Sequence, residues 1–169
     1  LNLNFKVAGK IYTTQADLVV GADGLRSSVR KLLFKKEHAP LRYLGCIVIL
    51  GICPLKNLGK YISDLLDSAT VFQTANGHER IYMMPYSSDA VMWQLSFPMS
   101  ENAAKHLSAQ GPQALKKEAR LRTPWHSPIP EIIEATQEKL ISGYPVYDRK
   151  VTATKTLATV GQVTLMGDA

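Results

Sequence analysis

The sequence lacks any apolar run that approaches the roughly 20 residues needed to cross a membrane as a helix. Its most apolar stretch, residues 41–55, is interrupted by Gly45, Gly51 and Pro54. The N-terminus lacks the layout of a signal peptide and has no starting methionine. We therefore expect no integral membrane segment, and we interpret the 169 residues as a piece of a longer chain.

Cysteine is scarce, and its placement argues against a disulfide. Cys46 and Cys53 lie in one apolar segment, an odd number of residues apart. If that segment is a strand, they lie on opposite faces and about 23 Å apart, well beyond disulfide reach. We expect buried free thiols in a reducing compartment, and hence a cytoplasmic protein. The four histidines have no metal-ligand spacing, so no metal site is expected.

Concentrated positive charge is also missing, although the net charge is +6. The basic residues are scattered, and the short clusters at 35–36 and 116–117 are interpreted as solvated helix ends or faces. Aromatic and basic residues do not interleave as they do in nucleic-acid-binding proteins, so no nucleic-acid partner is expected. The mildly basic surface favours anionic small molecules.

What is present near the start of the chain is a strand, a glycine turn and a helix. Residues 18–20 form a short apolar run that is typical of a strand covered on both faces. Gly21 and Gly24 predict backbone that reaches positive φ or lets another group approach closely. Ser27 and Ser28 are placed to cap or enter the helix, whose free first-turn amides favour an anion. The alternative is an ordinary strand-to-helix connection of any α/β domain.

The middle of the chain has the signals of an antiparallel sheet. Asn76-Gly77 is the strongest hairpin signal, because this dipeptide readily adopts the two-residue turn between paired strands. A second hairpin is predicted with its turn at Ala8-Gly9. The expected strands are residues 3–7, 10–13, 18–21, 42–53, 70–74, 79–84, 90–97, 141–146, 151–157 and 163–166.

Helical signals surround that sheet in the sequence. Pro112 suits the first turn of a helix, and Ser100 can begin another. The expected helices are residues 26–33, 100–109, 112–122 and 131–139, with a partly helical stretch at 55–66. The fold class predicted from this order is α+β (mixed α/β), with a mainly antiparallel sheet.

Two motifs carry a resemblance to a known family. Residues 161–169 form a second apolar strand that runs into Gly167-Asp168, long after Asp23-Gly24. The pair resembles the Asp-Gly and Gly-Asp motifs of FAD-dependent aromatic hydroxylases, the single-component flavoprotein monooxygenases of the p-hydroxybenzoate hydroxylase type. Segments that resemble the salicylate-hydroxylase-like branch are residues 76–86, 91–97, 130–136 and 147–149, together with Trp125.

The resemblance implies a division of the chain. Residues 1–38 would be part of an FAD-binding, Rossmann-like domain and would carry the Asp-Gly motif. Residues 39–150 would form a substrate domain, and residues 151–169 would return to the FAD-binding domain with the Gly-Asp motif. The strands that lead into the two motifs should then lie near each other and bring Asp23 and Asp168 to one side.

The resemblance also implies contacts with FAD. Asp23 and Gly24 would lie near the pyrophosphate and the path of NAD(P)H, with Arg30 bracing them. Gly167 and Asp168 would face the ribityl and pyrophosphate groups, with Asp168 accepting a hydrogen bond from a ribityl hydroxyl. From the residues alone, the alternatives are a local turn for Asp23 and a strand-end cap for Asp168.

Arg80 is the candidate substrate residue. It shares one face of its expected strand with Tyr82 and Met84, and related enzymes place an arginine near this position beside the substrate. Arg80 would pair with a carboxylate or phenolate. The alternative is a surface pair with an acid on the neighbouring strand. Trp93 is expected in the core.

The implied activity is hydroxylation of a small aromatic or related organic substrate. In the family, NAD(P)H reduces FAD, O₂ forms a flavin hydroperoxide, and the substrate is hydroxylated. The cofactor carries this chemistry, so no catalytic side chain is expected, and no Ser/His/Asp set was found. Alternatives are another flavin oxidoreductase, such as a reductase or halogenase, and a non-catalytic binding module that kept the fold. The Trp-x-Trp-x-Ile signature of flavin halogenases is absent.

One departure from the family pattern bears on the segment itself. The sequence contains no Gly-x-Gly-x-x-Gly fingerprint, and nothing follows the Gly-Asp motif except Ala169. The segment would thus lack the unit that binds the adenine half of FAD and part of the flavin cradle. We expect the isolated segment to be inactive and the longer chain to be the enzyme.

Overall fold

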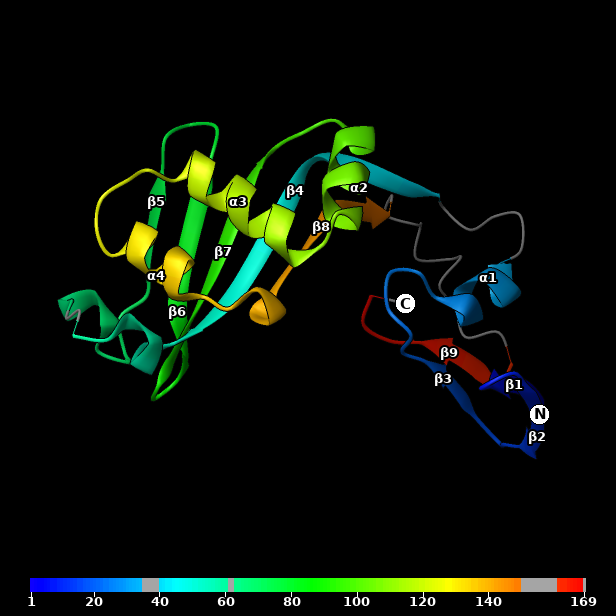
Figure 1. The fold of residues 1–169 in the computed structure, drawn as a ribbon. Helices are drawn as coiled ribbons and strands as arrows, with labels where there is room; N and C mark the ends of the chain where they lie inside the picture. Colours follow the sequence, from blue (N-terminus) through cyan, green and yellow to red (C-terminus); the bar gives the residue numbers. More distant parts are fainter. Residues whose placement is uncertain (35–39, 61–62, 150–160, 169) are drawn as a thin grey trace. The chain divides into compact units, whose positions relative to one another are not determined.

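The computed structural model describes residues 1–34, 40–60, 63–149 and 161–168. It divides into two compact units, one made of Leu1–Arg42 with Asp148–Ala169, the other of Tyr43–Tyr147. Figure 1 shows that both ends of the chain, blue and red, belong to the first unit. The strand expected at residues 151–157 lies outside the described residues.

The first unit begins with the predicted hairpin. Strands β1 (Asn2–Val7) and β2 (Lys10–Gln15) pair antiparallel, with Val7 opposite Lys10. Ala8 and Gly9 both have positive φ, 47° and 86°. A two-residue turn with positive φ at both positions matches the right-handed twist of the strands that it joins.

A parallel strand pair forms the rest of this unit. Strand β3 (Val19–Gly21) lies beside β9 (Val163–Leu165), with Val19 opposite Val163, and helix α1 (Ser28–Phe34) follows β3. The prediction that the two strands lie near each other is confirmed. The prediction of a strand covered on both faces is wrong among the described residues. Val20 stays 46% exposed because α1 packs on β3 from one side only.

The second unit is built on one sheet. Its strand order is β5-β6-β7-β4-β8, and the pairs β5–β6, β6–β7 and β4–β7 are antiparallel. The predicted Asn76-Gly77 hairpin is confirmed, since it joins β5 to β6. The strand bounds are β4 (Leu41–Pro54), β5 (Phe72–Ala75), β6 (Arg80–Ser87), β7 (Ala90–Pro98) and β8 (Ile141–Arg149).

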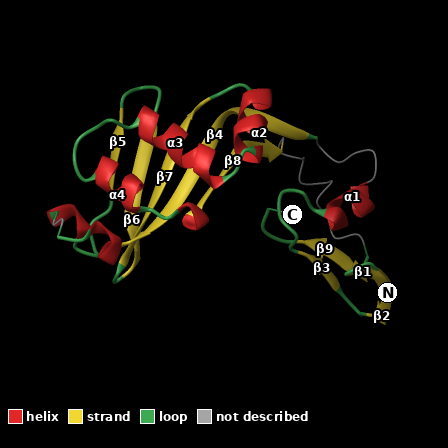
Figure 2. Ribbon diagram, in the orientation of Figure 1, coloured by secondary structure: helices red, strands yellow, loops and turns green. Residues whose placement is uncertain are grey.

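Helices α2 (Glu101–Ala109), α3 (Pro112–Arg122) and α4 (Ile129–Ala135) lie on one face of this sheet (Figures 1 and 2). Ser100 caps α2 and Pro112 opens α3, as predicted. Side chains that alternate along the strands point into the space between sheet and helices. The largest core residues include Ile47, Ile49, Ile81, Met83, Trp93, Leu95, Phe97, Leu115, Ile129, Ile132 and Ile133.

The connecting segments differ from expectation in two places. The stretch at 55–66 contains two 3₁₀ turns, η2 (Leu55–Leu58) and η3 (Asp64–Leu66). The helix expected at 131–139 ends at Ala135, and a further turn, η4 (Glu138–Leu140), follows. The buried Thr136 hydroxyl donates to Ile132 O and accepts from Trp93 Nε1 at 2.9 Å. Thr136 has extended backbone, with φ of −72° and ψ of 123°, so α4 ends before it, and the bond from Trp93 ties this helix end to β7.

The cysteines follow the strand argument. Cys53 is buried in the core and Cys46 is half-buried on β4, and both are free. Burial raises the pKa of each thiol, which keeps it protonated and unreactive. Among the described residues, no helix is long and apolar enough to cross a membrane.

Candidate functional site

The Asp-Gly turn is organised by the Asp23 carboxylate. Its Oδ2 accepts from the backbone amides of Ser28, at 2.6 Å, and Val29, at 3.3 Å. Its Oδ1 accepts from the Ser27 hydroxyl at 2.5 Å. The expectation of free helix amides for an external anion is therefore wrong at Ser28 and Val29, because the chain's own carboxylate occupies them.

Ser27 connects the carboxylate to the first turn of α1. The residue is 1% exposed, and its hydroxyl also accepts from the Arg30 amide at 2.9 Å. The Ser27 hydroxyl, together with the amides of Ser28 and Val29, lowers the pKa of Asp23, against a partial desolvation that raises it. Asp23 is thus held as a carboxylate whose charge is balanced by helix donors.

The two glycines of this turn have different structural roles, one in close packing and one in backbone conformation. An added Cβ at Gly21 would lie 2.8 Å from both Leu165 Cδ2 and Val29 Cβ, so strand, helix and neighbouring strand approach each other through this position. Gly24 has φ of 71°, and nothing lies within 4 Å of the position of an added Cβ. Close packing at Gly21 and positive φ at Gly24 match the two uses predicted for these residues.

The Gly-Asp turn follows the paired strand. The Met166 amide donates to Gly21 O at 2.9 Å, which carries the β3–β9 ladder up to the last residue before the turn. Gly167 has φ of 66° with open space at its Cβ position, and Asp168 is exposed. Because the strands are parallel, both glycine turns leave the same edge of this strand pair.

Two arginines lie close in the chain or in space to the Asp-Gly turn. The Arg30 guanidinium carbon lies 6.0 Å from the Phe34 ring centroid, one helical turn along α1. Arg149 Nε, at the end of β8, donates to Leu25 O at 2.9 Å. The sequence offered no signal for the Arg149 contact, because its partner is distant in the chain, whereas Ser27 was predicted to cap or enter the helix.

The candidate substrate residue lies on the second unit. Arg80 Nε donates to the Gln73 side-chain oxygen at 3.1 Å, and the guanidinium lies 5.9 Å from the Tyr82 ring centroid. Arg80 is exposed and makes no ion pair with any of the residues that the structure describes. The alternative of a cross-strand pair with an acid is therefore not what the structure has.

The neighbouring acid is engaged elsewhere. Glu79 Oε1 accepts from Arg122 Nη1 at 3.0 Å, and Oε2 accepts from Asn76 Nδ2 at 2.7 Å. The Asn76 amide and then Arg122 lower the pKa of Glu79, while partial desolvation opposes them. Glu79 thus closes the hairpin and forms its ion pair with Arg122 and not with Arg80.

A shallow cavity of about 350 Å³ lies at this end of the sheet, lined by Arg80, His78, Cys46 and Ser96 among others. Arg80 pairs directly across from Ser96, so both belong to the sheet face that is opposite the helices. Farther along that face, Tyr82, Met84 and Met92 are half-buried. The face thus combines an apolar floor with one cationic end.

Comparisons with known proteins agree with these motifs. A family model described as "FAD binding domain" matches residues 2–169. The aurachin C monooxygenase/isomerase of Stigmatella aurantiaca is 30% identical over 135 residues, which are 80% of this chain and 32% of that protein. The chain therefore spans about a third of the length of this relative.

Solved structures share the fold at lower identity. Klebsiella pneumoniae HpxO, complexed with FAD and uric acid, has 18% identity and a TM-score of 0.74, over 98% of this chain and 41% of that one. Pseudomonas aeruginosa PqsL, in complex with 2-aminobenzoylacetate, has 21% identity and a TM-score of 0.60, over 95% and 39%. The α+β fold class predicted from the sequence is confirmed, as is the resemblance to FAD-dependent monooxygenases.

Proposed function

Since this chain belongs to the FAD-binding domain family, we propose that the longer protein it represents is an FAD-dependent monooxygenase acting on a small organic molecule. One observation carries the proposal. The parallel pairing of β3 and β9 brings the Asp-Gly and Gly-Asp turns to one strand edge, although they are far apart in the chain. The similarity to a monooxygenase/isomerase supports the same reading.

The two units are proposed to divide the work. Residues 1–38 and 151–169 belong to the cofactor domain, and residues 39–150 form the substrate domain. Exposed Val20 in β3 and exposed Leu18 just before it support the first assignment, because further elements of a larger parallel-sheet domain would cover such apolar side chains. The helix-free sheet face with Arg80 supports the second.

The site residues fit FAD mainly through their backbone. Gly24 and Gly167 have positive φ and open space where a Cβ would be, so a ligand can approach the chain there. The exposed Asp168 carboxylate accepts a hydrogen bond from a sugar-like hydroxyl. Asp23 and Arg30 are proposed to hold the turn in shape, since Asp23 is saturated by Ser27 and the α1 amides.

The proposed reaction inserts one oxygen atom of O₂ into a substrate C–H bond and releases the other as water, with NAD(P)H as the two-electron donor. Bound flavin supplies the redox chemistry, and the protein orients the substrate and excludes water. Arg80 is proposed to hold an anionic group of the substrate at the end of the apolar floor. The bound molecules named for HpxO and PqsL are compact and organic, which supports a substrate of that size.

Asp168 provides the test of the cofactor assignment. In the full-length protein, Asp168→Ala removes one charged acceptor, which is worth about 1.5–3 kcal/mol, so the Kd for FAD should rise about 10- to 150-fold without unfolding. The control is Asp17→Ala, an exposed acid of the same unit. Unchanged FAD affinity, measured by fluorescence titration of apoprotein, would show that Asp168 does not contact the cofactor.

Turnover separates the enzyme from a binding module. The full-length protein should oxidise NAD(P)H faster with an aromatic carboxylate present, and ¹⁸O₂ should label the product with one oxygen atom. Arg80→Ala should raise KM for a carboxylate substrate far more than Lys56→Ala, a change of an exposed lysine in η2. A protein that binds flavin but transfers no oxygen to a substrate would be a binding module and not a monooxygenase.

A further inference from the structure

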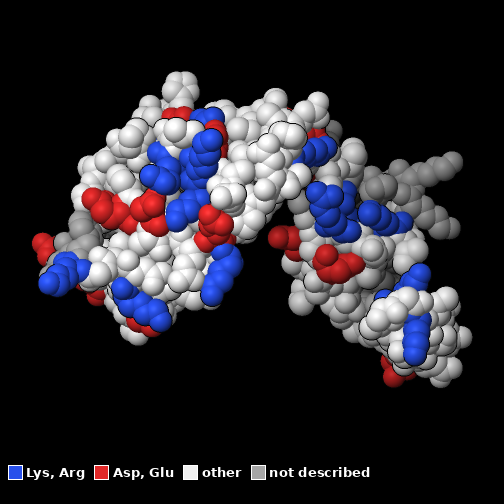
Figure 3. All heavy atoms as spheres, viewed as in Figure 1, with Lys and Arg blue, Asp and Glu red and all other residues white. Residues whose placement is uncertain are grey.

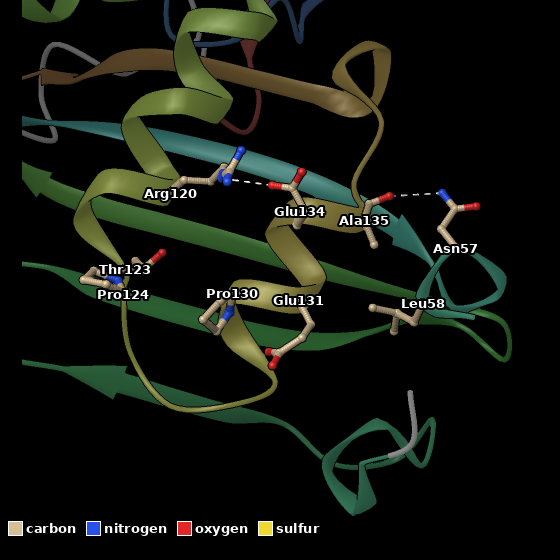
Figure 4. Close-up of a pocket in the computed structure, with 9 residues that line it drawn as sticks. All are labelled: Asn57, Leu58, Arg120, Thr123, Pro124, Pro130, Glu131, Glu134 and Ala135. Carbon is tan, nitrogen blue, oxygen red and sulfur yellow. Dashed lines mark hydrogen bonds and ion pairs between the residues drawn. The ribbon is translucent and has the colours of Figure 1, made fainter. Parts of the chain in front are cut away.

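The helical side of the second unit carries two adjoining hollows. One, of about 640 Å³, has Leu58, Pro124, Pro130 and Ala135 in its lining (Figure 4). The other, of about 860 Å³, has Gln113, Lys117, Leu121 and Glu138 in its lining. Arg120 and Glu134 line both hollows and form an ion pair of 2.9 Å between them. We call this surface of α3, α4 and η4 the α3–α4 face.

Charges of opposite sign lie in neighbouring rows on this face. Helix α3 contributes exposed Lys117 and Arg120, while α4 and η4 contribute exposed Glu134 and Glu138. Figure 3 shows the blue atoms gathered over α3 with red atoms beside them. Arg120 and Glu134 are each 58% exposed, so their ion pair contributes little by itself and exchanges partners easily.

An apolar projection and an apolar recess occur on the same face. Leu121 is 67% exposed at the rim of the polar hollow, next to Arg120. The other hollow is lined mainly by apolar atoms from Leu58, Pro124, Pro130 and Ala135. An exposed leucine close to an apolar recess is typical of a protein interface that has a buried apolar centre and a polar rim.

We propose that the α3–α4 face is the interface of a homodimer with twofold symmetry. A twofold axis through the Arg120–Glu134 pair places the basic row of each copy against the acidic row of its partner. The same rotation directs Leu121 of one copy toward the apolar recess of the other. Such an interface is isologous, since one patch supplies both complementary halves.

The occupant is inferred to be a second copy because the face is complementary to itself. A different acidic protein would match only the Lys117 and Arg120 row, and a basic one only the Glu134 and Glu138 row. An isologous contact uses both rows and both apolar features at once. Opposite charges that face each other across an interface also fix its register.

The test uses the full-length protein with FAD bound, and measures its dimerisation by sedimentation velocity over a concentration series. Leu121→Glu should raise the dimer Kd at least about 100-fold, because it places a charge where the proposed dimer seats a leucine in an apolar recess. Arg120→Glu should weaken the dimer similarly by juxtaposing like charges. Combining Arg120→Glu with Glu134→Arg restores complementary rows, so the double variant should regain most of the affinity.

The matched control is Lys31→Glu, an equal charge change at an exposed residue of α1 in the other unit. It should leave the dimer Kd unchanged. Far-ultraviolet circular dichroism and retained FAD confirm that each variant is folded. A wild-type protein that stays monomeric at all concentrations would overturn the proposal, as would a dimer unaffected by Leu121→Glu, open polymers, or a double variant that is not rescued.

Discussion

Ser27 shows how a single buried hydroxyl holds the Asp-Gly turn in shape. It donates to the Asp23 carboxylate at 2.5 Å and accepts from the Arg30 amide at 2.9 Å, with 1% of the residue exposed. Each bond satisfies a group at the start of α1 that would otherwise need water. The turn that leads to Gly24 is therefore stiffened from inside, before any ligand binds.

We expect Ser27→Ala to lower the free energy of unfolding of the full-length protein by about 1–2 kcal/mol, since it removes a cap and leaves the Arg30 amide unsatisfied. Ser28→Ala is the control, because that side chain is exposed, and its effect should stay within about 0.5 kcal/mol. Urea unfolding followed by fluorescence measures both. Equal stability of the two variants would contradict the role given to Ser27.

At the scale of the elements, β4 and β7 are joined through a glycine and a tryptophan. Gly51 pairs with Trp93, and a Cβ added to Gly51 would lie 2.4 Å from Trp93 Cε2. The Trp93 indole instead packs directly over the β4 backbone at Gly51, and its Nε1 donates to the Thr136 hydroxyl at the end of α4. This contact, and not a bend in the strand, explains the glycine.

Gly51→Ala should therefore destabilise the second unit by about 1–3 kcal/mol through overpacking. Trp93→Phe alone should also destabilise, because it removes the bond to Thr136 and core volume. The double variant should be less destabilised than the sum of the two, because the smaller ring makes room for the methyl group. Additive free energies in this double-mutant cycle would argue against the steric account.

The β5–β6 hairpin is tied to α3 by Glu79. Its carboxylate accepts from Asn76 and Arg122, and the Arg122 guanidinium carbon lies 3.9 Å from the Phe97 ring centroid. These bonds lower the pKa of Glu79. A carboxylate with a lowered folded pKa contributes stability above its unfolded pKa, about 4.3, and loses it as the pH falls through the folded pKa.

The pH dependence of stability should reveal this link. Wild type should lose more unfolding free energy than Glu79→Gln between pH 6 and the acid side of the folded pKa, and the two curves should converge there. Asp17→Asn, at an exposed acid outside the hairpin and the α3–α4 face, should follow wild type. Parallel curves for wild type and Glu79→Gln would mean that the carboxylate contributes no pH-dependent stability.

At the scale of the molecule, the two units differ in how completely they bury their apolar side chains. The second unit contains the whole cluster of buried core residues. In the first unit, Leu18 is 57%, Leu32 77% and Met166 62% exposed. A unit with so little burial has little hydrophobic free energy to hold it folded.

Hydrogen exchange of the 169-residue chain should separate the units. Amides of β6 and β7 should exchange only on global unfolding, whereas those of β3 and β9 should exchange much faster through local opening. In the full-length protein, amide exchange in β3 and β9 should be selectively slower than in the 169-residue chain. Equal protection of the two sets in the isolated chain would show that the first unit is stable by itself.

The 169-residue chain alone should lose FAD on gel filtration, whereas the full-length protein should stay yellow. Micromolar affinity needs about 8 kcal/mol after the cost of immobilising a flexible ligand. The two glycine turns offer only a few hydrogen bonds, each worth about 0.5–1.5 kcal/mol net. A flavin spectrum that stays with the isolated chain would show that these turns hold the cofactor without further sequence.

The sequence by itself determined many local features of this protein. The turns at Ala8-Gly9 and Asn76-Gly77, the helix starts at Ser100 and Pro112, and the free cysteines all follow from the sequence. Each depends on φ preferences, capping or strand alternation within a few residues. For the same reason, the Asp-Gly and Gly-Asp turns can be predicted from the sequence without knowing that their strands pair.

Only the tertiary structure decided features that depend on partners distant in the chain. Trp93 bonds to Thr136 at the end of α4, Arg149 donates to the Leu25 carbonyl, and Arg80 donates to Gln73 rather than pairing with an acid. The exposure of Val20 is another such case, since an apolar run shows that a strand can be covered but not what covers it. The strand neighbours and helix contacts that settle these points are set by long-range packing, which short sequence patterns do not encode.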